Sequence, residues 1–326
     1  MDADFVWRDG ERLIRYGPHA LSDADGLLAE RRFAPYTLLT TPRALSFAPT
    51  LATHAAAVVE VPPGQVPDIA AAIRGRLERR ALVALGGGRV VDVAKAIAAA
   101  DGLACAAVPT TMSGAEMTGI HRLPAGVSGV ATVRPSLVIA QPSLLASQPM
   151  PALAASAMNA LGHAFEALFG PYANPVATDA GLRAARLIAQ GLGPREPDRD
   201  ALALGSVLAG YAIGATGLAV HHVVCQSIVR ISGAPHAGVN AVMLPATVGM
   251  VERRLPDVVE AFRSVLGRDL DGLAALSGAT RLGQLGVSPE IVPQVVDAIA
   301  GRAEELARTP RPPDRDELRA LIESRL

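Results

Sequence analysis

The stretch that most constrains the fold is segment 81–96, where five apolar residues run directly into three glycines and then into a helix-forming pattern. Such a sequence predicts a buried parallel strand that turns into a helix. Gly86, Gly87 and Gly88 carry no Cβ, so the backbone there can take positive φ angles and a diphosphate can approach the N–H groups at the helix start. Because tight strand-to-helix turns also favour glycine without any ligand, the predicted nucleotide site needs support from the rest of the chain.

The composition and the hydrophobic pattern predict the fold class. The 326 residues suffice for about two domains at roughly 150 residues per domain. Half of the residues are apolar and only 3% are aromatic, which predicts cores of Ala, Val, Leu and Ile. In the first half, apolar runs alternate with helical patterns, which favours a parallel α/β sheet. We expect a strand region that ends at Tyr16, a helix that begins near the candidate N-cap residues Ser22 and Asp23, a helix over 66–80, and strands at 36–40, 55–61, 81–85, 105–108 and 136–140.

The pattern changes near residues 148–151. From there to Leu326, Ala- and Leu-rich amphipathic segments predict helices, and no segment convincingly predicts a strand. The sequence therefore predicts an α/β domain over 1–148, which carries the glycine turn, and an all-helical domain over 149–326.

Charge and cysteine usage exclude several classes of protein. Thirty basic and thirty-one acidic residues leave a formal charge of −1, so we expect neither a nucleic-acid nor a membrane partner. Cys105 and Cys225 lie in unrelated apolar contexts, which predicts neither a disulfide nor a thiolate metal site. The polar N-terminus lacks a secretory pattern and no long apolar run appears, so we expect a cytoplasmic protein.

Polar side chains recur at helical spacing in the second half. Asn159 and His163 lie four residues apart, His222 and Gln226 repeat this spacing, and His236 follows a proline. Residues four apart share one face of a helix. Burying such groups costs free energy unless a ligand, a metal or another side chain satisfies them. We therefore expect these residues to line a pocket.

The segment 109–118, PTTMSGAEMT, together with the glycine turn, resembles the motifs of the iron-containing alcohol dehydrogenase superfamily. The family pattern is GGGS, then Asp or Gly and AKA, followed by PTTxxGSExT, and the form here is most similar to the maleylacetate reductases. The resemblance continues at 159–168, 221–226 and 235–238. It implies a dinucleotide-binding α/β domain and a helical catalytic domain in the dehydroquinate synthase-like architecture, with hydride transfer in the cleft between the two domains.

The resemblance also implies a bound NAD(H) or NADP(H). Carried over by position, the residues expected at the cofactor are Gly86, Gly87, Gly88, Arg89 and Asp92 near the pyrophosphate, Thr110, Thr111 and Ser113 near the adenosine and ribose, and Thr41 and Pro42 near the adenosine. Arg43 could meet a 2′-phosphate or simply be solvated.

In the metal-dependent members of the family, an aspartate and three histidines hold a divalent ion that polarises the substrate oxygen. The matching residues here are Asn159, His163, His222 and His236. Asparagine removes the only anionic ligand, so we expect Fe or Zn to be held weakly by the three histidines or to be absent. The imidazoles can then hydrogen-bond the substrate instead.

Three further departures from the family pattern matter. Gln226 stands where a histidine usually relays a proton, and glutamine cannot titrate. Met112 replaces a tyrosine common in maleylacetate reductases, and Arg89 replaces a serine that closes the glycine turn. Loss of the polar groups at 226 and 112 suggests either a substrate different from maleylacetate or proton delivery by one of the three histidines, by His221 or by water.

We therefore expect an NAD(P)H-dependent reductase of a small carbonyl or enol acid, similar to maleylacetate reductase and homodimeric as the family implies. Arg134 and the pair His121-Arg122 could bind a substrate carboxylate or lie on the surface. Gln226 and Arg89 leave open a non-redox lyase or cyclase with a degenerate cofactor or metal site. A non-catalytic binding module is the third reading.

Overall fold

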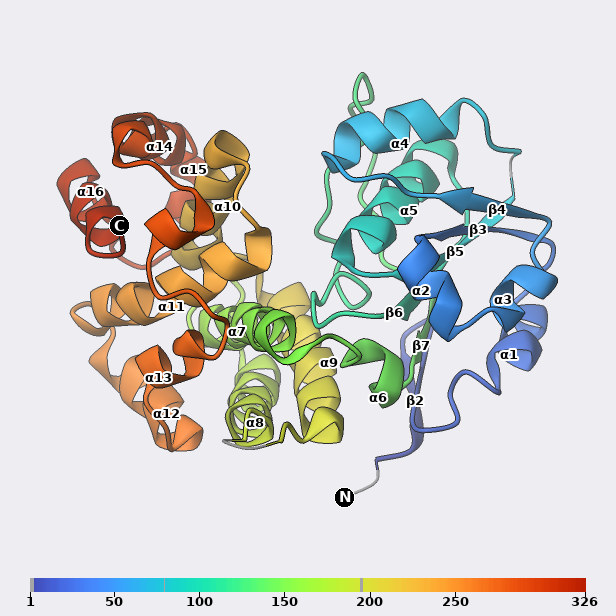
Figure 1. Cartoon of the computed structure of the whole chain (residues 1–326), viewed down its shortest axis with the longest axis horizontal. Helices are drawn as coiled ribbons and strands as arrows, with labels where there is room; N and C mark the ends of the chain where they lie inside the picture. The colour runs from blue at the N-terminus through green and yellow to red at the C-terminus, as the bar shows by residue number, and fades with distance from the viewer. Residues whose placement is uncertain (1–2, 79, 194–195) are drawn as a thin grey trace. The chain divides into compact units, whose positions relative to one another are not determined.

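The computed structural model describes residues 3–78, 80–193 and 196–326. The chain divides into two compact units, Met1–Ser147 and Gln148–Leu326. All strands belong to the first unit, and the described part of the second unit is helical, as Figure 1 shows. The predicted succession of an α/β half and an all-helical half is confirmed. Residues 1–2 of the predicted first domain and Arg79 of the predicted helix over 66–80 lie outside the described residues.

The first unit contains one seven-stranded sheet in the order β1-β2-β7-β6-β5-β3-β4. Its strands are β1 Phe5–Asp9, β2 Arg12–Tyr16, β3 Tyr36–Thr40, β4 Ala57–Glu60, β5 Ala81–Gly86, β6 Cys105–Pro109 and β7 Leu137–Ala140. All neighbouring strands pair in parallel except β1 and β2. The predicted parallel sheet is confirmed apart from this hairpin, where Gly10 at φ 59° lets the chain reverse within two residues.

Helices cover both faces of this sheet (Figure 1). Leu38 and Val83 pack with α1, α2, α3 and α6 on one face, whereas Leu39 and Leu82 pack with α4 and α5 on the other. Successive strand residues point to opposite faces, so two-sided burial explains why these strands are apolar throughout. The helices are α1 Ala24–Glu30, α2 Pro42–Phe47, α3 Thr50–Thr53, α4 Val66–Arg74, α5 Gly88–Asp101 and α6 Pro142–Leu145.

The strand order creates a switch point between β3 and β5. The chain leaves β3 for β4 on one side and returns to β5 on the other side. The register sets Thr40 beside Leu85 and Gly86 beside Pro109, so the carboxyl ends of β3, β5 and β6 meet at one edge. Open α/β sheets bind ligands at such an edge.

Two details differ from the sequence prediction. The helix expected over 66–80 ends at Arg74, because Gly75, a poor helix former, follows it and the Arg74 guanidinium bonds Asp101 at the end of α5. Asp23 stands at the start of α1 but its side chain does not cap that helix. Its Oδ2 instead accepts a hydrogen bond from Arg15 Nε at 2.6 Å.

The second unit is built from helices that bury long apolar faces. They are α7 Met150–Glu166, α8 Pro175–Gly191, α9 Arg199–Thr216, α10 Val220–Ser232, α11 His236–Glu252, α12 Pro256–Leu266, α13 Leu270–Ala275, α14 Val292–Ala300, α15 Ala303–Leu306 and α16 Arg315–Glu323, with 3₁₀ turns at Leu282–Leu285 and Pro289–Ile291. Within the described residues, no single helix has the length and apolar character of a membrane span. Only α9 and α10 taken together, bent by 101°, reach that length and composition.

Candidate active site

The glycine turn after β5 is shaped by close packing. None of Gly86, Gly87 and Gly88 has a positive φ, so the turn does not use the left-handed backbone that glycine permits. A Cβ on Gly87 would lie 3.0 Å from Thr111 Cγ2, and a Cβ on Gly88 would lie 2.9 Å from Ser113 Cβ. The glycines therefore let the turn after β5 approach the turn after β6. As a result, two glycines expected at the pyrophosphate lie against Thr111 and Ser113, which are expected at the adenosine and ribose.

The turn leads into α5, and no side chain caps the N-terminus of this helix. Gly87 is the N-cap residue, and Gly88 and Arg89 begin the helix. The first N–H groups of a helix lack intrahelical acceptors and attract anions. Arg89 is exposed on this first turn.

Asp92 contributes an internal ion pair. Its Oδ1 lies 2.9 Å from Nζ of Lys95, which is completely buried. Lys95 Nζ also donates to the carbonyl oxygens of Ala115 at 2.8 Å and Ile120 at 3.1 Å. Asp92 thus pairs with the buried Lys95, which holds segment 115–120 against α5. The sequence predicted Asp92 at the pyrophosphate and did not predict this ion pair.

The remaining residues expected at the cofactor lie on the same sheet edge. Thr41 caps α2 by accepting from Ala44 N at 3.3 Å, and Pro42 is the first residue of that helix. Thr110 is buried, and its N–H donates to Gly86 O at 3.0 Å. Arg43 stacks its guanidinium over the Phe47 ring at 5.3 Å.

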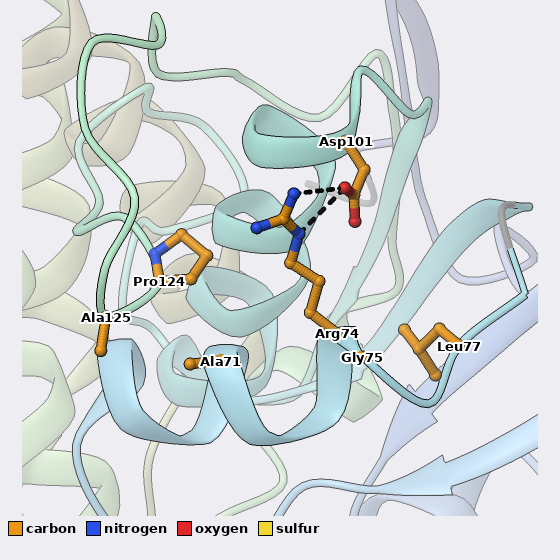
Figure 2. Close-up of a pocket in the computed structure, with 7 residues that line it drawn as sticks. All are labelled: Ala71, Arg74, Gly75, Leu77, Asp101, Pro124 and Ala125. Carbon is orange, nitrogen blue, oxygen red and sulfur yellow. Dashed lines mark hydrogen bonds and ion pairs between the residues drawn. The ribbon is translucent and has the colours of Figure 1, made fainter.

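The first unit also has a cavity of about 380 Å³ between α4, α5 and the loop at Pro124 and Ala125, shown in Figure 2. None of the residues expected at the cofactor lines it. Arg74 Nε and Nη2 both donate to Asp101 Oδ1, at 2.9 and 2.7 Å, so the charges on its wall compensate each other (Figure 2).

In the second unit, α7 and α10 bring two of the predicted histidines together. The rings of His163 and His222 stack with centroids 4.6 Å apart and planes 11° apart. Asn159 lies one turn before His163 on α7. Three polar atoms are buried and have no hydrogen-bond partner in the described part of the chain, namely Asn159 Oδ1, His163 Nδ1 and His222 Nε2. Unpaired buried polar atoms are rare in proteins and indicate a ligand, an ion or a water at that place.

Glu166 is a buried residue of this site to which the sequence analysis gave no role. It is completely buried at the end of α7, and its Oε2 lies 2.7 Å from His222 Nδ1. The same carboxylate accepts the backbone N–H groups of Ala219 and His222. An acidic residue in an apolar helix, three residues after His163, was the available signal, because a buried carboxylate needs partners.

The other predicted site residues are placed differently. His236 is exposed at the start of α11, and Asn240 Nδ2 lies 3.3 Å from its Nε2. Gln226 is held by Arg302, whose Nη2 donates to Gln226 Oε1 at 2.9 Å. His221 is buried with its Nδ1 3.3 Å from Thr247 Oγ1, and its ring centroid lies 5.0 Å from that of His222.

Met112, proposed from the family pattern to replace a tyrosine, is completely buried. Arg134 and Arg122 are exposed and reach Asp9 and Gln65 at 3.4 Å. Both arginines therefore lie on the surface of the first unit, and His121 accepts the N–H of Val133.

Burial controls the charge of the stacked histidines. Burial, then the neighbouring His222 and His236, hold the pKa of His163 well below its ordinary value. Burial and His236 lower the pKa of His222 to about 3. Both imidazoles are therefore neutral at neutral pH, each with one N–H and one lone pair.

These donors do not fit a firmly held divalent metal. Within residues 3–78, 80–193 and 196–326, no group of three or more His, Cys, Asp or Glu side chains is arranged around a possible ion. Asn159, His163 and His222 offer an amide oxygen and two imidazole nitrogens, with no negative charge among them. Fe²⁺ or Zn²⁺ would lack the anionic ligand that strengthens such sites.

Comparison with known proteins shows the family. A model described as "Fe-containing alcohol dehydrogenase family, C-terminal" matches residues 153–326, and one described as "Iron-containing alcohol dehydrogenase" matches residues 16–121. These matches identify an oxidoreductase, and the chain belongs to the iron-containing alcohol dehydrogenase family.

The similar relatives include maleylacetate reductases. Maleylacetate reductase 1 of Rhodococcus opacus is 35% identical over 280 residues, covering 80% of this chain and 77% of its own. The maleylacetate reductase of Pseudomonas aeruginosa is 33% identical over 279 residues, covering 80% and 78%. The crystal structure of maleylacetate reductase from Agrobacterium tumefaciens matches with a TM-score of 0.83 at 26% identity, covering 100% of this chain and 99% of its own. These relatives do not favour the lyase or cyclase alternative.

Proposed function

We propose that this protein is an NAD(P)H-dependent reductase that acts on a small carbonyl or enol acid of the maleylacetate type. The observation that carries the proposal is the stacked pair His163 and His222, with buried unpaired nitrogens, in a chain similar to maleylacetate reductases. The uncapped start of α5 supports a dinucleotide in the first unit.

In the first unit, the open N–H groups at Gly88 and Arg89 receive the pyrophosphate, and the Arg89 guanidinium adds a positive charge. Thr41, Pro42, Thr110, Thr111 and Ser113 surround the adenosine and ribose on the same sheet edge. Since Arg43 stacks on Phe47 and donates to Ser147 Oγ at 3.3 Å, it is already engaged, which supports NAD(H) over NADP(H).

In the second unit, the polar groups of α7 and α10 orient the substrate. The reduced nicotinamide, when bound, supplies a hydride. His163 and the Asn159 amide then stabilise the negative charge that develops on the substrate oxygen, an effect that is strong in a buried site. Gln226 cannot titrate and the buried imidazoles are neutral, so the exposed His236 or water delivers the proton. No step requires a metal.

A glycine substitution tests the cofactor part of this proposal. Gly88→Ala places a Cβ 2.9 Å from Ser113 Cβ, which is fixed to its backbone, so we expect the turn to be distorted. Dinucleotide affinity measured by calorimetry should fall about 10-fold or more, as expected for roughly 1.4 kcal/mol of lost binding. Gly26→Ala, in α1 with open space around its Cβ, is the matched control and should bind normally.

The activity itself is measured as oxidation of NADH or NADPH with maleylacetate and with other α-keto and enol acids. A purified protein that binds neither dinucleotide and oxidises neither with any of these acids contradicts the proposal. The homodimer and the cytoplasmic location stay predictions from the sequence and the family.

A further inference from the structure

Glu166 occupies an unusual position, since one buried carboxylate serves both a helix terminus and a histidine of the site. Its Oε2 accepts from Ala219 N at 3.0 Å, and its Oε1 accepts from His222 N at 3.2 Å. Ala219 is the N-cap residue of α10, and no side chain of its own caps that helix. Glu166 thus caps α10 from α7, where a negative charge also interacts favourably with the helix dipole.

The third contact of Glu166 decides the orientation of the His222 ring. Oε2 lies 2.7 Å from His222 Nδ1, so this edge of the ring faces the carboxylate. The opposite nitrogen, Nε2, is buried and has no hydrogen-bond partner among the described residues. A flip of the ring would place the Cδ2–H group where Nδ1 now lies and so lose the bond to Glu166, which favours the observed orientation.

The contact between Glu166 and His222 Nδ1 also indicates which ring nitrogen of His222 carries the proton. Both oxygens of Glu166 already accept backbone N–H groups, which can only donate and which favour the ionised carboxylate. Burial raises the pKa of Glu166, whereas the neighbouring His221 and the backbone N–H groups of Ala219, His222 and His221 act in the opposite direction.

We propose that Glu166 is a positioning residue that holds His222 as the Nδ1–H tautomer and so presents Nε2 to the substrate as a hydrogen-bond acceptor. This inference rests on the proposed function for the identity of the ligand. A bare Nε2 accepts from a hydroxyl group and cannot donate to a carbonyl oxygen. Of a hydroxyl and a carbonyl oxygen on the substrate, only the hydroxyl, as in an enol or a hydroxy acid, can donate to His222, while His163 and Asn159 remain the donors.

The tautomer can be observed directly in the free protein. With ¹⁵N-labelled histidine, long-range ¹H–¹⁵N spectra distinguish a protonated from a bare ring nitrogen, and the His222 signals are assigned by their loss in His222→Gln. We expect a proton on Nδ1 and a bare Nε2 near neutral pH. A proton on Nε2 of the wild-type protein overturns the proposal, whatever the enzyme assay shows.

Glu166→Gln is the companion variant. Its amide NH₂ must replace one of the two accepting oxygens, so it faces either a backbone N–H or His222 Nδ1 as a donor. We expect the Nδ1–H signal of His222 to weaken or move to Nε2, and kcat with the reductase substrate to fall about 10- to 100-fold, as for other residues that orient a functional histidine. KM for the dinucleotide should stay within twofold, because Glu166 belongs to the second unit.

Glu317→Gln is the matched control, because Glu317 also accepts the N–H of an N-cap residue, Asp314, at 3.1 Å, with no histidine involved. It should leave the tautomer and kcat unchanged. If Glu166→Gln retains the Nδ1–H tautomer and full kcat, Glu166 is only a structural cap and the proposal is wrong. Absence of any reductase activity in the wild-type protein would contradict the proposed function, whereas the tautomer measurement would still decide the role of Glu166.

Discussion

Glu116 is the most unusual single residue of the first unit, because its carboxyl group is completely buried in the segment between β6 and β7. Burial raises its pKa to about 7, although the charges of Lys95 and Arg12 act in the opposite direction. Lys95 is fixed by Asp92 and Arg12 by the carbonyl oxygens of Pro135 and Glu116, so neither cation forms an ion pair with Glu116.

This environment predicts how stability changes with pH. The folded protein holds a proton on Glu116 up to about pH 7, whereas the unfolded chain releases it near the ordinary pKa of 4.5. The stabilisation is therefore complete below pH 4.5 and is lost as the pH rises through 7. At about 1.4 kcal/mol per pKa unit, the loss is of the order of 3 kcal/mol.

Glu116→Gln removes this proton exchange and keeps the shape of the side chain. The free energy of unfolding, measured with urea at several pH values between 4.5 and 8, should fall less steeply in the variant than in the wild type. Glu60→Gln, at an exposed position of β4, controls for the loss of one carboxylate. Parallel curves for wild type and Glu116→Gln would show that Glu116 does not titrate in this range.

At the scale of elements, the packing of α7 on α10 depends on Gly162. A Cβ on this residue would lie 2.8 Å from both Cδ2 and Nε2 of His221. The His221 ring is completely buried and bound to Thr247, so it has little room to move. Gly162 therefore allows the close approach that also stacks His163 on His222.

Two glycine-to-alanine variants separate packing from helix propensity. Alanine favours a helix interior by about 1 kcal/mol over glycine, whereas overpacking a core costs about 1–3 kcal/mol. Gly162→Ala should therefore destabilise the second unit by about 1–2 kcal/mol in thermal or urea unfolding. Gly249→Ala, inside α11 with open space around its Cβ, should stabilise it by up to about 1 kcal/mol. Equal effects of the two variants would contradict the packing argument.

Local sequence patterns predicted most elements of this fold. The apolar runs at β3, β5 and β6 begin at the predicted residues, because two-sided burial leaves a clear signal. The end of α4 was predicted six residues too late, since the apolar spacing of Ile69, Ile73 and Leu77 continues past Gly75, where the helix stops. Periodicity reports which face is buried and is less informative about where a helix ends.

At the scale of the whole molecule, the rate at which the single lysine is chemically modified measures how often the first unit opens. Lys95 is the only lysine in the sequence, and its Nζ has three partners in the buried interior. An amine reagent can reach Nζ only after segment 115–120 separates from α5. Modification of Lys95 should therefore follow unfolding of this unit rather than surface exposure.

Dinucleotide binding should slow this modification. A ligand at 100 times its Kd stabilises the folded state by about 2.7 kcal/mol, so Lys95 acylation followed by mass spectrometry should slow roughly 100-fold. Arg76→Lys adds an exposed lysine at the end of the α4 segment and should be acylated at once in either condition. Rapid labelling of Lys95 in the free protein would show that segment 115–120 opens locally.

The sequence by itself determined the α/β and helical halves, the glycine turn, and the family membership of the chain, because these depend on apolar runs and on residues adjacent along the chain. Only the tertiary structure decided why the turn needs glycine and which charges are paired. Space for Thr111 and Ser113, rather than backbone torsion, excludes a Cβ at Gly87 and Gly88. Glu166 acquires its role from Ala219 and His222, 53 and 56 residues further along the chain. Contacts between residues so far apart produce no recognisable pattern in a single sequence, so only the packed structure reveals them.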